Sequence, residues 1–246
     1  MAVQLRKEGV PVDNECRVDM NAFGEIYGEK ALNYDKQRIE SLERQWRKMK
    51  GLSKEEYTKA KMCSLGEKME MLKTAIFQKN LSPDFIVARS SHYDDIENGV
   101  DNIILEKKTG NLVCAFDEVA DVDSPRYEEK IDKVLWRNMT KNGGILKYGL
   151  KMEKEGGKME LKLGRAKNAP VFYLALSPWL VEEGAKKFKP QIGEQSDYEK
   201  IIFNDFINSL NEQIEIINSK FKNLPPSIKE RILRFQESLG RFLKNK

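Results

Sequence analysis

The feature that most constrains this chain is an acid-rich stretch, residues 93–121, that contains two short apolar runs. The runs 103–105 and 112–116, with a polar, glycine-containing loop between them, predict an antiparallel β-hairpin. Asp101 stands at the start of the first predicted strand, and Asp117 follows the end of the second. Because the start of one strand in a hairpin lies beside the end of the next, the sequence predicts that the two carboxylates converge at one end of a sheet.

Two carboxylates that converge repel each other unless a positive charge lies between them, and a hard divalent cation with oxygen ligands suits such a site. The sequence therefore predicts a metal site formed by Asp101, Asp117 and Glu118. The same acids have an alternative role, because acidic residues at turns and strand ends often accept hydrogen bonds from backbone amides.

Composition places the chain among globular proteins. Of its 246 residues, 33% are charged and 40% hydrophobic, and the net charge of +4 permits contact with nucleic acid without requiring it. Cys16, Cys63 and Cys114 are widely separated and form no CxxC pair, so we expect reduced thiols and a cytoplasmic location. His92 is the single histidine, which leaves little material for a histidine-based metal site or a serine–histidine triad. No apolar run approaches the roughly 20 residues that span a bilayer, so no membrane partner is expected.

Helical patterns dominate both ends of the chain. We expect residues 1–54 to form an N-terminal helical extension that starts irregularly, residues 55–190 an α/β core, and residues 191–246 a C-terminal helical hairpin packed on the core. Ser53 and Glu56 match a capping box and predict one helix that continues to the strand region. The two C-terminal helices have apolar stripes that fit each other, the core or a second subunit, so they also allow a homo-oligomer.

Between these ends, the pattern alternates strands with one helix. Residues 85–88 predict a short buried strand, and Ser124 followed by Pro125 predicts the start of a helix that ends at a pair of glycines. Alternating apolar and basic residues on both sides of a turn at 155–157 predict a second hairpin. The unbroken apolar run 171–176 predicts a central strand that is buried on both faces.

Three short motifs lie within roughly residues 55–176, each at a defined position on the predicted helix or strands. They are Gly66 with Glu70 on the helix before the sheet, Gly99-Val100-Asp101 at the start of one strand, and Asp117-Glu118-Val119 at the end of the next. In these positions the chain resembles the PD-(D/E)xK nuclease superfamily. The resemblance implies an α/β fold with a restriction-endonuclease-like mixed β-sheet core flanked by helices, here with helical N- and C-terminal additions.

The third motif departs from the family pattern, in which the acid is followed two residues later by a lysine. Strand alternation places Asp117 and Val119 on the same face, and valine can neither activate a water nor stabilise a charged transition state. Lys130 and Lys133 on the following helix are candidate replacements for this lysine, and Asp121 is a candidate further metal ligand.

The resemblance implies metal-assisted hydrolysis of phosphodiester bonds in DNA or RNA. Asp101 and Asp117 would hold Mg²⁺ or Mn²⁺, and Glu70 would contact the ion through water. Nucleic acid would bind along the basic face of the second hairpin, formed by Lys147, Lys151, Lys158, Lys162, Arg165 and Lys167. The alternative for these cations is the solvent-exposed face of an ordinary hairpin.

Two further functions stay open. The missing lysine favours a nuclease-like protein that is catalytically inactive and keeps its contacts with nucleic acid or protein, whereas the pair Asp101 and Asp117 favours an active enzyme. A third interpretation is a helical interaction protein, in which the terminal helices build an oligomer and the middle of the chain is a scaffold.

Overall fold

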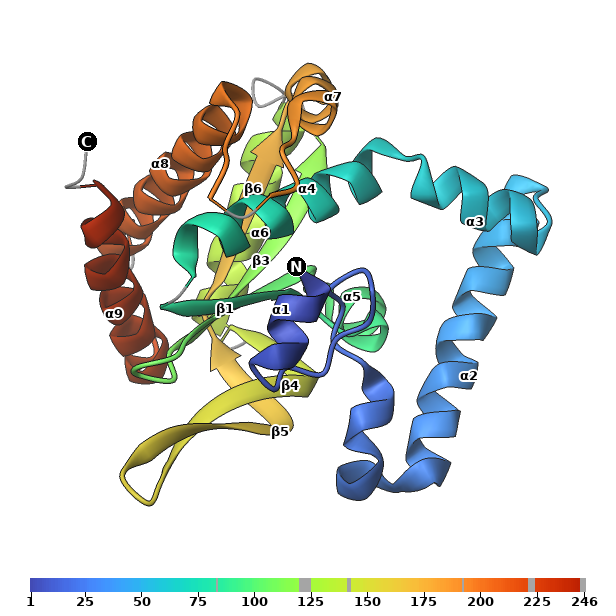
Figure 1. The fold of residues 1–246 in the computed structure, drawn as a ribbon, viewed down its shortest axis with the longest axis horizontal. Coiled ribbons are helices and arrows are strands. Elements are labelled where there is room, and N and C mark those ends of the chain that lie inside the picture. The colour runs from blue at the N-terminus through green and yellow to red at the C-terminus, as the bar shows by residue number, and fades with distance from the viewer. Residues whose placement is uncertain (83, 120–124, 141–142, 192, 221–223, 244–246) are drawn as a thin grey trace.

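A mixed sheet of four strands forms the centre of the molecule (Figure 1). In this computed structural model, the described residues are 1–82, 84–119, 125–140, 143–191, 193–220 and 224–243. The sheet order is β1 (Phe85–Arg89), β2 (Asn102–Glu106), β3 (Leu112–Val119) and β6 (Val171–Leu176). The first two pairings are antiparallel and the third is parallel.

The sequence signals for these strands are confirmed. The predicted hairpin pairs Ile103 with Cys114, and the predicted strands 85–88 and 171–176 are both present. The central position predicted for 171–176 is wrong, because β6 lies at one edge of the sheet, where α6 (Pro125–Thr140) and α8 (Asp197–Lys220) pack against it. Parallel pairing of β3 with β6 requires a crossover connection, and α6 supplies it. The mixed α/β class follows from this arrangement.

The second predicted hairpin is also confirmed and forms a sheet of its own. β4 (Gly144–Glu155) and β5 (Lys158–Ala169) pair along their length, with register shifts near Leu146. The loop of the first hairpin lies against this second one. A Cβ at Gly110, which has a φ of +69°, would lie 2.7 Å from the carbonyl oxygen of Met152, so this close approach requires glycine.

One face of the four-stranded sheet is covered by four helices. These are α4 (Leu65–Leu81), α7 (Pro178–Lys187), α8 (Asp197–Lys220) and α9 (Pro226–Leu243). Their buried side chains include Phe77, Phe206 and Phe235, each of which stabilises the fold by about 1.5–3 kcal/mol when removed from water. A capping box of Ser196 and Glu199 is present at the start of α8.

The opposite face is covered by the N-terminal segment, α5 (His92–Asn98) and β4. The sequence predicts an irregular start of the chain, and this prediction is wrong. The segment contains α1 (Ala2–Lys7) and a 3₁₀ helix, η1 (Met20–Phe23). Leu5 and Phe23 are fully buried there. Between these helices, the chain runs beside the edge strand β1 through a parallel bridge of Arg17 with Arg89.

The prediction of one continuous helix from Ser53 to the strand region is wrong. The predicted capping box is present, but α3 (Lys54–Met62) ends before Cys63, and Ser64 caps α4 by accepting a hydrogen bond from the backbone N–H of Glu67. Together with the long α2 (Gly24–Lys50), α3 forms an arm that stands away from the sheet, on the right in Figure 1. None of the helices within the described residues has the length and apolar character needed to cross a bilayer.

Candidate active site at the start of β2

Asp101 is held at the entrance to β2 by backbone hydrogen bonds on both sides. Its N–H donates to the carbonyl oxygen of Ala115 at 3.1 Å, and its carbonyl oxygen accepts from the N–H of Ser90 at 2.8 Å. Burial of the carboxyl group and the nearby carboxylate of Glu70 together raise the pKa of Asp101 to about 7. The position at a strand start agrees with the sequence, and the perturbed acid marks a candidate functional site.

Lys73 of α4 is the residue that the sequence analysis missed. It is fully buried, it lies one helical turn after Glu70, and its ammonium interacts electrostatically with Asp101 and Glu70. Burial lowers the pKa of Lys73 to about 7, although both carboxylates act in the opposite direction. A signal was present in the sequence, because Lys73 falls among apolar helix positions, including Met69 and Leu72, where a solvated lysine is not expected.

A short hydrogen-bond chain fixes α4 against β2. The side-chain amide of Asn102 donates to Thr74 Oγ1 at 2.7 Å, and this hydroxyl donates to the backbone carbonyl of Glu70, also at 2.7 Å. Asn102 directly follows Asp101, and Thr74 directly follows Lys73. The chain of bonds therefore sets the position of the Lys73 backbone relative to the Asp101 backbone.

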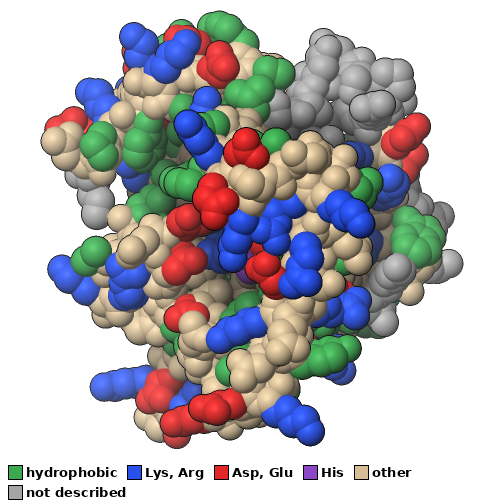
Figure 2. All heavy atoms as spheres, turned by 90° about the vertical axis from the view of Figure 1, so that its right-hand side faces the viewer, with side chains coloured by type: hydrophobic (Ala, Val, Ile, Leu, Met, Phe, Trp, Pro, Cys, Tyr) green, Lys and Arg blue, Asp and Glu red, His purple; other side chains and the backbone are tan. Residues whose placement is uncertain are grey.

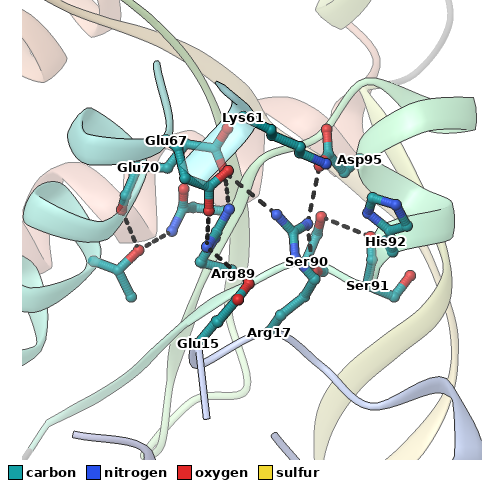
Figure 3. Close-up of polar contacts among 12 residues, drawn as sticks. Glu15, Arg17, Lys61, Glu67, Glu70, Arg89, Ser90, Ser91, His92 and Asp95 are labelled. Carbon is teal, nitrogen blue, oxygen red and sulfur yellow. Dashed lines mark hydrogen bonds and ion pairs between the residues drawn. The ribbon is translucent and has the colours of Figure 1, made fainter. Parts of the chain in front are cut away.

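The carboxylate of Glu70 is shared between two guanidinium groups. Arg89 Nη2 lies 2.6 Å from Glu70 Oε2, and Arg17 Nη2 lies 3.5 Å from the same oxygen. Arg89, which is fully buried, also contacts Glu67 Oε1 at 2.6 Å (Figure 3). Glu70, the acid predicted to contact a metal, is thus already ion-paired within the protein.

The N-terminal segment completes this charge cluster. Arg17 Nη1 donates to Asp95 Oδ2 at 2.9 Å, so residues from α4, α5, β1 and the N-terminus meet at one place (Figure 3). Arg17 lowers and Asp95 raises the pKa of Asp101, although both effects are smaller than those of burial and Glu70. The arginines are brought in by long-range contacts that the sequence pattern does not reveal.

For the motif Asp117-Glu118-Val119, the structure describes the backbone and not the side chains. Asp117 and Glu118 lie in β3, where their backbones pair with Leu174 and Ala175, while their side chains lie outside the described part of the structure. Asp121 lies outside the described residues altogether. Within the residues that are described, no three histidine, cysteine, aspartate or glutamate side chains are grouped as a metal site.

The two lysines predicted to replace the motif lysine differ in position. Lys130 is half-buried, and its ammonium lies 5.9 Å from the ring centroid of Tyr173 on β6. Burial and the nearby Lys133 lower the pKa of Lys130, whereas the carboxylate of Asp101 acts to raise it. Lys133 is exposed. Lys130 therefore shares the electrostatic environment of Asp101, but Lys73 is the more deeply buried of the two cations.

The basic residues of the second hairpin are not brought to this site as one group. Lys147 forms an ion pair with the buried Asp35 and lies over three tyrosine rings. Lys162 forms ion pairs with Glu155 and Glu160 on the same hairpin. The others sit on the hairpin surface, with Lys151 half-buried and Lys158, Arg165 and Lys167 exposed.

Comparison with protein-family models, with curated proteins and with solved structures finds no match to this chain. The assignment of a function therefore depends on the geometry and chemistry of the site itself.

Proposed function

We propose that this protein is a metal-dependent nuclease with a restriction-endonuclease-like core. The observation that carries the proposal is the buried Lys73 on α4, whose ammonium interacts electrostatically with Asp101 and Glu70, because α4 would thereby supply the cation that the strand position Val119 lacks. The order of elements supports the fold assignment: α4 precedes three antiparallel strands, and α6 followed by the β4–β5 hairpin then leads to a fourth strand parallel to β3.

The chemistry of Asp101 supports a divalent cation at this position. Asp101 has a raised pKa because it is buried near a second carboxylate, and a cation beside it would offset that repulsion. Its oxygen donors match the preference of Mg²⁺ and Mn²⁺. Asp101 and Asp117 would hold the ion, and Glu70 would reach it only through water, since its carboxylate is bound by Arg89. When bound, such an ion polarises a phosphoryl oxygen and acidifies a water molecule.

Lys73 would perform the acid–base and charge-stabilising work. Burial lowers the pKa of Lys73, so its amine would lose a proton more easily than that of a solvated lysine. It could then accept a proton from an attacking water or, in its protonated form, stabilise negative charge on the phosphate. Arg89 and Asn102 act as positioning residues, because they hold Glu70 and Thr74 on the neighbouring turns of α4.

The proposal predicts that Asp101→Asn abolishes metal-dependent cleavage. We expect a loss of about 10³-fold or more, because the substitution removes a ligand charge and leaves the size of the side chain unchanged. The assay follows labelled single-stranded and duplex DNA and RNA with Mg²⁺, with Mn²⁺ and with EDTA. Asp84→Asn, at an exposed acid next to β1, is the matched control and keeps parental activity. Cleavage that persists in Asp101→Asn would place the chemistry elsewhere or in a contaminant.

A second candidate function is a nuclease-like binding module without catalysis. It is favoured by the ion pairs of Glu70 with Arg89 and Arg17, because these pairs neutralise a carboxylate that an active site would keep available. The same assay distinguishes the two, since this alternative gives binding of nucleic acid without any metal-dependent product.

A further inference from the structure

The tip of the arm carries the densest positive charge near the candidate site. Between Arg44 and Lys61 the chain contains seven basic and two acidic residues, a local net charge of +5 against +4 for the whole chain. Figure 2 presents the side from which the arm projects, and Lys and Arg side chains lie across the middle of this face together with Asp and Glu side chains. A concentration of positive charge such as that between Arg44 and Lys61 attracts a polyanion and holds its phosphates.

A cleft of about 420 Å³ lies between this arm and the core. Its arm wall contains Trp46, Tyr57, Lys50 and Lys61. Trp46 is 37% exposed, and Lys50 Nζ lies 5.6 Å from the ring centroid of Tyr57, so two aromatic rings lie among cations. The volume falls in the range of small-ligand sites, roughly 300–1,000 Å³.

The opposite wall of this cleft belongs to the candidate active site. Glu70 and Asp95 line it, and both carboxylates act on the pKa of Asp101. Lys61 reaches from the arm toward the same charge cluster (Figure 3). A ligand bound in the cleft would therefore have aromatic rings and cations on one side and the proposed catalytic groups on the other.

We propose that this cleft binds single-stranded nucleic acid, with one unpaired base stacked on Trp46 or Tyr57 and the adjoining phosphates on Lys50 and Lys61. The inference rests on the proposed nuclease function, because it names the substrate class of that site. A single strand is favoured over a duplex, because stacking on a protein ring needs a base whose face is free. Cations interleaved with aromatic rings are the usual composition of such a surface.

This surface differs from the one that the sequence predicts. On the second hairpin, Lys147 pairs with Asp35 and Lys162 pairs with Glu155 and Glu160. On the arm, Lys61 Nζ lies 3.7 Å from Glu43 Oε1. The arm cleft combines cations with aromatic side chains and opens onto Glu70. The two surfaces can therefore be compared directly by substitution.

The test is fluorescence anisotropy with labelled 12-nucleotide DNA and RNA single strands and the matching duplexes, in EDTA so that cleavage does not occur. We expect the parent to bind a single strand more tightly than its duplex. Trp46→Ala should weaken this binding at least about tenfold, the usual effect of removing a stacking ring. Trp179→Ala, at an exposed tryptophan on α7, is the matched control and should leave the affinity within twofold.

A charge comparison tests the phosphate contacts. Lys50→Ala/Lys61→Ala should lower the slope of log affinity against log salt by about 1.4, because each phosphate contact to a single strand contributes about 0.7. Lys158→Ala/Lys167→Ala on the second hairpin should leave this slope unchanged. Equal affinity for duplex and single strand, or parental binding by Trp46→Ala, would overturn the inference, as would a loss confined to the hairpin variant.

The outcome separates this inference from the proposed nuclease function. Trp46-dependent binding by a protein that cleaves nothing with any metal would support the cleft and contradict the nuclease. If cleavage requires Asp101 but binding of nucleic acid is unchanged in Trp46→Ala, the nuclease function is supported and the proposed binding site in the cleft is overturned.

Discussion

Lys73→Met is expected to abolish cleavage. Methionine is similar in length and is uncharged, so it fills the same space on α4 among apolar neighbours. We expect cleavage to fall by about 10³-fold, the effect of removing one group that stabilises the transition state. The free energy of unfolding should also fall, because removing one partner of a buried charge pair leaves Asp101 buried near Glu70 without the ammonium of Lys73.

Measuring the cleavage rate and the stability of the same variant separates a loss of catalysis from a loss of folded protein. The experiment measures cleavage rates under single-turnover conditions and urea denaturation of the same preparations. Lys68→Met, at an exposed position on the same helix, is the matched control and should retain both activity and stability. If Lys73→Met cleaves at the parental rate, Lys73 has no catalytic role. Lys130→Met then becomes the decisive variant, because Lys130 also interacts with Asp101.

Asp94→Ala is expected to be the most destabilising single substitution near the site. Asp94 is fully buried in α5, and its carboxylate accepts hydrogen bonds from the backbone N–H groups of Lys147 and Tyr148 at 2.7 and 3.0 Å. It also accepts from the Ser91 hydroxyl at 2.8 Å and from the Asn98 amide at 2.6 Å. Alanine would leave these donors buried without their acceptor, at a cost of about 3–5 kcal/mol.

Chemical denaturation measures this cost. Asp94→Asn should lose roughly half as much free energy of unfolding, because its amide oxygen can still accept hydrogen bonds while its NH₂ group faces other donors. Asp132→Ala, at an exposed acid on α6, should change stability by no more than about 0.5 kcal/mol. A loss below about 1 kcal/mol in Asp94→Ala would contradict the role of this carboxylate in joining α5 to β4.

Local patterns were sufficient to predict most of the sheet. The apolar run 171–176 and the alternation in the second hairpin have the periods of strands, and a glycine loop joins β2 to β3. The sequence pattern does not predict the break between α3 and α4, because Ser64, the N-cap of α4, lies within a pattern that is helical on both sides. Tertiary packing decides whether such a position ends a helix.

The candidate site was predictable only in part. Asp101 stands out because it follows a glycine-containing turn and opens an apolar strand. The partners of this acid come from distant parts of the chain: Lys73 from α4, and Arg17 from the N-terminal segment. The sequence does not distinguish a solvated lysine or arginine from a buried one. The roles of Lys73 and Arg17 therefore become clear only once the packing is known.

The most direct measurement of the central claim is calorimetric titration of Mn²⁺ into the metal-free protein, with Asp101→Asn and Asp84→Asn beside it. The proposed site predicts that the parent and Asp84→Asn bind one ion and that Asp101→Asn does not. Absence of binding to the parent, or equal binding by Asp101→Asn, would contradict a metal site at Asp101 and with it the proposed hydrolysis of phosphodiesters.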